Sequence, residues 1–235
     1  MEALVTAARR RESGVLLEGV HALKHAVRFG ADIEVVLTPD AGELRRLLAE
    51  LAPDVVLPVE IVEVDATRWR RLVPRDLPSP ALAVARRPPD AFGEVLASHT
   101  GRVVVLEQPR HLGNLGAAVR VAAAAGAAGL AVVGEADPWH PTAVRSAAGL
   151  QFALAVARVD ALPPTSRPLV AIDPDGPDLH EVGIDADAVL LFGTERGGLS
   201  PALRARADRQ VAIPMRPGVS SLNLATAVGI VLYAR

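Results

Sequence analysis

The sequence predicts an α/β fold in which a helix-covered parallel sheet follows a smaller α/β unit. Apolar runs such as Val103 to Leu106 indicate strands buried on both faces, which is typical of parallel sheets. From residue 102 onwards these runs alternate regularly with helical patterns. The run Pro88-Pro89-Asp90 interrupts the pattern before that point. We therefore expect a first domain over residues 1–90, a linker over 91–101 and a second domain over 102–235.

Short helices and strands are expected to alternate in the first domain. Val20, Leu23 and Val27 recur at helical spacing, and Ile33 opens a short β-branched run typical of a strand. The predicted helices cover residues 18–29, 43–51 and 67–72, and the predicted strands cover residues 33–37, 59–64 and 81–85.

The second domain is expected to carry the functional loops. Its predicted strands cover residues 103–107, 130–134, 152–158, 168–172, 188–192 and 210–213, and its predicted helices cover 114–126, 141–149, 201–207 and 221–234. Ligands of open α/β sheets bind at the loops that leave the carboxyl ends of the strands. Three loops at such positions have unusual sequences.

The amino-acid composition excludes several kinds of site and bears on the choice of partner. The 235 residues include no cysteine, which excludes disulfides, cysteine-ligated zinc and a thiolate nucleophile. The net charge of −2 does not by itself favour a nucleic-acid partner. Lys24 is the only lysine, so arginine supplies nearly all of the basic residues. Arginine suits phosphate groups, but GC-rich coding is the simpler explanation of the bias, so the positions of the arginines matter more than their number.

The chain is expected to be cytoplasmic. Residues 1–12 lack the apolar core of a signal peptide. The longest apolar run, residues 121–134, is too short to span a bilayer.

The first unusual loop, residues 107–120, follows the opening strand of the second domain. Asn114 is expected to cap the next helix, and Gly113 and Gly116 allow close turns of the backbone. Arg120 would then lie less than two turns into the helix, near the mouth of the loop. Taken alone, this loop is better explained by a capping asparagine beside a solvated arginine.

The second loop, residues 192–201, has three glycines within six residues. Ser200 and Pro201 form a favourable helix start, as N-cap and first helical residue. The spacing fits neither a dinucleotide-binding nor a Walker A motif. Glycines here would let the backbone approach a ligand closely, and Glu195 would form an ion pair with a cationic group or orient a hydroxyl. A plain strand-to-helix turn is the alternative.

The third loop, residues 213–225, leaves a strand at Pro214 and is expected to enter a helix near Ser221. Ser220 is the expected N-cap, and Asn223 would turn its amide towards the same cleft. By itself this is an ordinary capping pattern.

In this order and spacing, the three loops closely resemble the three motifs of the SpoU/TrmH family of RNA methyltransferases in the SPOUT superfamily. The resemblance covers residues 102–235. Residues 1–90, with Leu17-Glu18-Gly19, resemble the L30e-like domain that often precedes this one. The matching motif positions are Asn114, Gly116 and Arg120, then residues 192–195 with Gly198 and Leu199, then residues 213–215 and 221–223.

The resemblance implies a trefoil-knotted parallel sheet and an RNA 2'-O-ribose methyltransferase of ribosomal or transfer RNA. It implies S-adenosylmethionine as cofactor, a homodimer with the active site near the subunit interface, and no metal. The positions implied to bind the cofactor are Gly193, Gly198, Ile213, Met215 and Leu222.

The resemblance also implies catalytic roles. A guanidinium keeps its proton at neutral pH, so Arg120 would stabilise the developing 2'-alkoxide or grip the adjacent phosphate rather than act as a base. Asn114 and Ser221 would hold the ribose or Arg120, and Glu195 and Asn223 would brace the loops and the cofactor.

Clustered arginines are expected to dock the RNA, with Trp69 as a stacking surface beside one cluster. Solvated helix faces are the alternative interpretation. The expected RNA contacts are Arg9, Arg10, Arg11, Arg68, Arg70, Arg71, Arg75, Arg86 and Arg87.

Other functions fit the sequence less well. Glu18, His21 and His25 would share one helical face, but no further metal ligand stands nearby in sequence. Hydrolase and dinucleotide-binding signatures are missing. The serious alternative is a protein that binds RNA with the same fold but transfers no methyl group.

Overall fold

The computed structural model describes residues 1–194 and 197–234. The chain forms two compact units. Unit 1 comprises Met1–Pro89 together with Trp139–Ala153, and unit 2 comprises Asp90–Pro138 together with Leu154–Arg235. Residues 139–153, which sequence reasoning placed in the second domain, thus belong to the same compact unit as the first.

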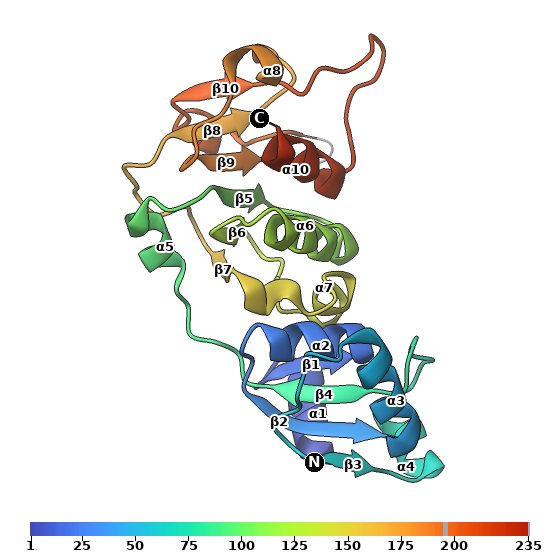
Figure 1. Ribbon diagram of the computed structural model, residues 1–235. Helices are drawn as coiled ribbons and strands as arrows, with labels where there is room; N and C mark the ends of the chain where they lie inside the picture. Colours follow the sequence, from blue (N-terminus) through green and yellow to red (C-terminus); the bar gives the residue numbers. More distant parts are fainter. Residues whose placement is uncertain (195–196, 235) are drawn as a thin grey trace. The chain divides into compact units, whose positions relative to one another are not determined.

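Unit 1 is a mixed sheet with helices (Figure 1). Its strand order is β1-β4-β2-β3, with β4 antiparallel to both neighbours and β2 parallel to β3. The strands are β1 (Val15–Glu18), β2 (Ile33–Thr38), β3 (Ile61–Glu63) and β4 (Leu82–Ala85). The helices are α1 (Glu2–Arg10), α2 (Val20–Arg28), α3 (Ala41–Leu51), α4 (Ala66–Leu72) and α7 (Pro141–Ser146), followed by the 3-10 helix η1 (Leu150–Ala153).

Local chemistry explains where these elements begin. The Asp40 side chain accepts from the backbone amide of Glu43 and caps α3, and Asp65 caps α4 in the same way. The helix expected over residues 18–29 starts only at Val20, because Glu18 still pairs within the sheet and Gly19 has a φ of 88°. The elements α1 and β1 were not predicted.

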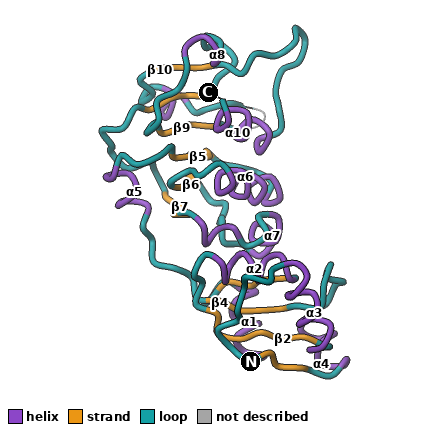
Figure 2. The backbone as a smooth tube through the Cα atoms, in the orientation of Figure 1, coloured by secondary structure: helices purple, strands orange, loops and turns teal. Residues whose placement is uncertain are grey.

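Unit 2 is a parallel sheet with helices on its faces (Figures 1 and 2). Its strand order is β10-β8-β9-β5-β6-β7, and neighbouring strands pair in parallel. The strands are β5 (Val103–Glu107), β6 (Gly129–Val133), β7 (Ala155–Val159), β8 (Leu169–Ile172), β9 (Val189–Phe192) and β10 (Arg209–Val211). The helices are α5 (Phe92–Ser98), α6 (Leu112–Ala124), α8 (Leu179–Val182), α9 (Pro201–Arg204) and α10 (Leu224–Tyr233).

The predicted α/β fold with a buried parallel sheet is confirmed. Residues Val103 to Leu106 of β5 and Val189 to Leu191 of β9 are fully buried, as strands covered on both faces must be. In the sheet, β6 and β7 lie on one side of β5, and the strands that follow them in the chain, β8, β9 and β10, lie on the other side. Loops on the two sides of β5 therefore diverge, which opens room for a ligand at the carboxyl ends.

The segment expected to be a linker, residues 91–101, instead contains α5. Phe92 and Leu96 of this helix are buried in the core of unit 2. The buried guanidinium of Arg167 donates to the backbone carbonyl of Val95 within α5 and to that of Gly101 after it. A helix of this length spans too few turns to show a hydrophobic period, so the sequence pattern did not reveal it.

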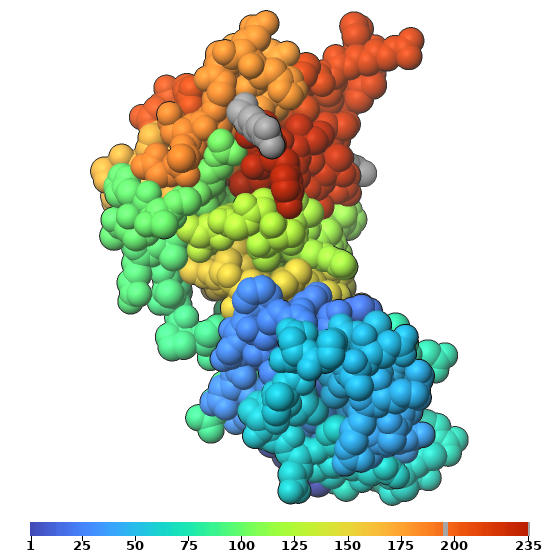
Figure 3. All heavy atoms as spheres, in the orientation of Figure 1, coloured from blue at the N-terminus to red at the C-terminus, as the bar shows by residue number. Residues whose placement is uncertain are grey.

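Helices α6 and α10 pack against each other and bring the first and third unusual loops to one side of the sheet (Figure 2). Gly229 of α10 allows this approach, since a Cβ there would lie 3.3 Å from Cγ1 of Val121. The exposed loop between β10 and α10 projects from the surface of unit 2 (Figure 3). Within the described residues, no helix has the length and apolar character needed to cross a membrane.

Candidate functional site

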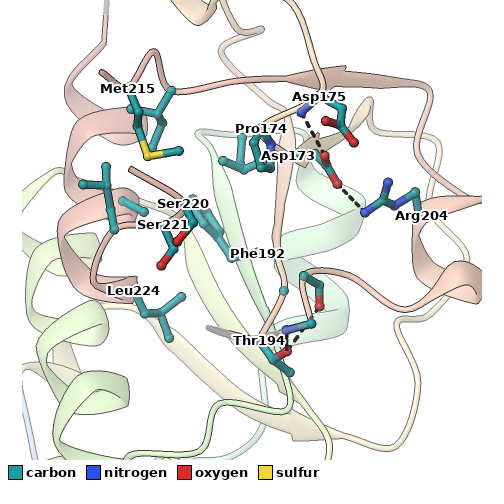
Figure 4. Close-up of a pocket in the computed structure, with 17 residues that line it drawn as sticks. Asp173, Pro174, Asp175, Phe192, Thr194, Arg204, Met215, Ser220, Ser221 and Leu224 are labelled. Atoms are coloured by element: carbon teal, nitrogen blue, oxygen red, sulfur yellow. Dashed lines mark hydrogen bonds and ion pairs between the residues drawn. The ribbon is translucent and has the colours of Figure 1, made fainter. Parts of the chain in front are cut away.

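A cavity of about 330 Å³ lies where β8, β9 and β10 end, against the start of α10 (Figure 4). Its apolar walls include Phe192 and Leu224, and hydroxyl groups come from Thr194 and Ser220. The cavity is therefore suited to a ligand with both an apolar body and polar groups. The sequence-predicted positions that line it are Gly193, Gly198, Ile213, Met215, Ser221 and Leu222.

The glycine-rich loop after β9 doubles back tightly on itself. Thr194 and Gly198 exchange backbone hydrogen bonds of 3.0 and 3.1 Å. A Cβ on Gly193 would lie 2.0 Å from the carbonyl carbon of Gly198, so only glycine fits there without moving the backbone. Gly198 has a φ of 63°. The loop thus presents bare backbone to the cavity, while Glu195 lies outside the described residues.

A carboxylate at the end of β5 holds the start of α9. Glu107, only 8% exposed, accepts from the backbone amide of Ser200 at 2.7 Å and from its hydroxyl at 2.6 Å. The predicted cap is confirmed, because the Ser200 hydroxyl oxygen accepts from the amide of Leu203. Glu107 was not predicted as a site residue. An acidic residue ending an otherwise apolar strand is the signal that marks it.

An ion pair forms the charged part of the cavity wall. Asp173, 3% exposed, follows β8 directly and lies 2.5 Å from Nη2 of Arg204. The backbone amide of Asp175 donates to the other carboxylate oxygen over 3.1 Å. Sequence reasoning missed this pair, although an aspartate directly after a buried strand was a visible signal.

Two predicted helix caps were wrong. Helix α6 begins at Leu112, so Asn114 lies in its first turn instead of capping it. Asn223, not Ser220, caps α10, because its side-chain oxygen accepts from the amides of the two residues after Leu224. The Nδ2 atom of Asn223 then donates to Oδ1 of Asn114 over 3.1 Å. The structure thereby joins two of the predicted catalytic residues.

Arg120 lies apart from the cavity walls. It is exposed on α6, more than two turns after Leu112 and thus farther along the helix than predicted. Among the described residues, Arg120 is not part of the cavity lining and its guanidinium has no hydrogen-bond or ion-pair partner.

Most of the predicted RNA-binding arginines of unit 1 pair with carboxylates. Arg68 pairs with Glu2 and Arg10 with Glu12. Trp69, predicted to stack on bases, packs partly buried against the core of unit 1. A helix face that also buries its tryptophan leaves less stacking surface than the sequence suggested.

The weak metal-site alternative loses its basis. Glu18 belongs to β1, so it does not share a helical face with His21 and His25. Residues 1–194 and 197–234 contain no group of three or more potential metal ligands.

Comparison with known proteins decides the family. The family model of the SpoU rRNA Methylase family matches residues 101–233. This chain belongs to the SpoU rRNA methylase family. The match covers β5 to α10, which include the cavity and all three unusual loops, of which the second and third line the cavity.

Relatives of this SpoU methylase cover nearly its whole length. A 23S rRNA (uridine(2479)-2'-O)-methyltransferase of Streptomyces viridochromogenes is 30% identical over 250 residues, covering 96% of this chain and 83% of the relative. A 23S rRNA (adenosine(1067)-2'-O)-methyltransferase of Streptomyces azureus is 31% identical over 231 residues, covering 94% and 85%. The solved SpoU methyltransferase AviRb of S. viridochromogenes, with AdoMet bound, has a TM-score of 0.81 at 29% identity over 99% of this chain and 94% of that one. The predicted family, enzyme class and cofactor are confirmed.

The residues of the cavity fit S-adenosylmethionine. Phe192, Ile213 and Leu222 supply apolar surface for its adenosine and for the carbons next to its sulfonium. Gly193 has no side chain to fill the cavity, and the hydroxyls of Ser220 and Ser221 offer hydrogen bonds to its polar groups.

Proposed function

We propose that this chain methylates the 2'-hydroxyl of a ribose in ribosomal RNA. One observation carries the proposal: six motif positions from the second and third loops line one cavity at the carboxyl ends of β8, β9 and β10. The relatives named for 23S ribosomal RNA favour ribosomal over transfer RNA.

Five of these positions are proposed to bind S-adenosylmethionine. When bound, this cofactor supplies a methyl group on a sulfonium that is already an activated leaving group. The residues of the chain would then hold the cofactor and the ribose and orient them towards each other. Positioning of this kind accounts for much of the acceleration in group-transfer enzymes. The proposed cofactor contacts are Gly193, Gly198, Ile213, Met215 and Leu222.

Arg120 is proposed as the catalytic residue that faces the RNA. Its guanidinium stays charged and would stabilise the alkoxide that develops as the 2'-hydroxyl loses its proton, or grip the neighbouring phosphate. Asn114 and Ser221 would position the ribose, and Asn223 fixes Asn114 through their hydrogen bond. Glu195 is proposed to brace the glycine-rich loop.

The position of Arg120 supports a homodimer. Because Arg120 does not line the described cavity of its own chain, a second copy that presents its α6 would complete the site. We also propose that residues 102–235 form the trefoil-knotted methyltransferase domain, that residues 1–90 form an L30e-like RNA-docking domain, and that the enzyme acts in the cytoplasm. The arginines predicted in unit 1 would supply the phosphate contacts.

Transfer of labelled methyl groups from S-adenosylmethionine to unmodified ribosomal RNA tests the proposal. Label on a ribose 2'-oxygen is the expected result, and the labelled nucleotide identifies the substrate. Binding of cofactor and RNA without any transfer would contradict it and favour the non-catalytic RNA-binding alternative.

A further inference from the structure

A buried carboxylate in unit 1 gathers three arginines. Glu18 ends β1, and its side chain is 1% exposed. Its Oε2 atom accepts from Arg75 and, over 3.1 Å, from Nη1 of Arg145. Arg9 lies at the other oxygen, with 3.8 Å between its Nη1 atom and Oε1. The three arginines come from α1, from the loop after α4 and from α7, so one carboxylate ties three separate segments together.

The charges of this arginine cluster, Arg9, Arg75 and Arg145 around Glu18, do not balance. Guanidinium groups remain protonated at any physiological pH. Within the part of the chain that the structure describes, no second carboxylate pairs with any of the three, so two positive charges are left over. The arginine side chains are 34%, 43% and 33% exposed, so each keeps an accessible edge.

Several other arginines of unit 1 are neutralised at the surface. Arg46 contacts two carboxylates, Arg86 contacts two others, and Arg68 pairs with Glu2. Such exposed pairs carry no net charge towards a polyanion. Arg70 and Arg71 of α4 form no salt bridge among the described residues, but no shared buried carboxylate holds them together as Glu18 holds the arginines of the cluster.

The cluster is also held in place before any ligand arrives. The buried carboxylate fixes the inner edge of Arg75 and of Arg145, and Arg9 additionally donates to the backbone carbonyl of Leu72. Orienting the side chains in advance reduces the entropy that a ligand must overcome on binding. Planar guanidinium groups with a free edge match the oxygens of a phosphodiester.

We propose that Arg9, Arg75 and Arg145, oriented by Glu18, bind phosphate groups of the RNA substrate. The inference rests on the proposed RNA methyltransferase function and adds a specific docking site to it. Arg145 was not among the predicted RNA contacts, because it lies far along the chain from the other two and only the fold brings it to Glu18.

Binding of unmodified 23S ribosomal RNA to the full-length protein, measured over a series of salt concentrations, tests this site. Arg75→Gln and Arg145→Gln are each expected to weaken binding several-fold. Each is also expected to lower the slope of log affinity against log salt by about 0.7 to 0.9, as one lost phosphate contact does. Arg145→Lys keeps the charge and should keep the wild-type slope. Arg46→Gln, at a neutralised surface arginine, should change neither quantity.

The folded state of each variant is read from thermal unfolding and from S-adenosylmethionine binding. Arg75 lies in a loop and is the most exposed of the three, so its variant tests the site even if Arg145→Gln unfolds. Folded glutamine variants with the wild-type affinity and slope would overturn the phosphate site and leave the proposed function standing. A wild-type protein that binds no RNA would overturn both.

Discussion

Asn223 donates a hydrogen bond of 3.1 Å to Asn114, although the two residues lie 109 positions apart. The same Asn223 side chain caps α10 through its oxygen, which accepts from the amides of Ala225 and Thr226. Both ends of one amide are therefore engaged. This pair ties the first motif to the third and fixes Asn114 relative to the cavity wall.

Two substitutions separate the roles of Asn223. Asn223→Asp keeps an oxygen that can cap α10 but loses the donor to Asn114, so stability should be retained while methyl transfer falls. Asn223→Ala loses both and should also destabilise the chain by about 0.5–2 kcal/mol, the usual cost of a lost N-cap. Denaturant unfolding and transfer rates measure the two effects. Full activity in the aspartate variant would show that the bond to Asn114 has no part in the reaction.

Gly193→Ala should abolish cofactor binding while leaving the fold intact. The added Cβ would lie 2.0 Å from the carbonyl carbon of Gly198, so the glycine-rich loop must shift. We expect affinity for S-adenosylmethionine to fall by at least about a thousandfold, equivalent to about 4 kcal/mol, so that calorimetry detects no binding. Gly93→Ala is the matched control, since its Cβ would meet nothing within 4 Å. Equal affinities in the two variants would mean that the loop does not contact the cofactor.

Arg120→Ala should slow methyl transfer without changing cofactor affinity. Loss of one group that stabilises developing negative charge costs about 100- to 1000-fold in rate. Arg120→Lys keeps the positive charge and should recover part of the loss. Single-turnover rates at saturating RNA separate chemistry from binding. A near wild-type rate in the alanine variant would remove Arg120 from the mechanism.

His25 should make unit 1 less stable below neutral pH. Partial burial lowers the pKa of His25 below its usual 6.5, helped by the positive charges of Lys24 and Arg28 and opposed by the hydrogen bond to the carbonyl of Ala148. Between the lowered pKa and 6.5 the unfolded chain binds the proton more readily than the folded one. Stability is therefore fully present above pH 6.5 and decreases as the pH falls towards the folded pKa.

Urea unfolding at a series of pH values measures this effect. His25→Asn places an amide donor near the position of Nδ1, which lies 2.9 Å from the Ala148 carbonyl, and removes the titration. The variant should lose part of the decline in stability between pH 7 and pH 5. An identical decline in both proteins would assign the pH dependence to other groups.

Local patterns predicted most of the fold. Continuous apolar runs marked the strands of the parallel sheet, and Ser200 with Pro201 correctly marked the start of α9. These features depend on residues close together in sequence. The starts of α6 and α10 were misplaced. Asn114 lies inside the first turn of α6, and Asn223, not Ser220, caps α10 while it also donates to Asn114.

Features of the site that depend on distant partners were not predictable. From the sequence, Glu107 is only the last residue of a strand. Its role depends on hydrogen bonds from Ser200, which lies 93 positions later in the chain. Asp173 likewise needs its contact with Arg204 to be recognised as part of the cavity wall. Motif positions identify which loops matter, but ion pairs and hydrogen bonds between the loops depend on packing that no single segment encodes.

The most direct test of the account is the identity of the methylated product. Unmodified 23S ribosomal RNA is incubated with the enzyme and S-adenosylmethionine, digested to nucleosides, and analysed by mass spectrometry. The account predicts one 2'-O-methylated nucleoside that appears with the wild-type enzyme and not with Gly193→Ala. A methyl group on a base, or the same product from both proteins, would contradict it.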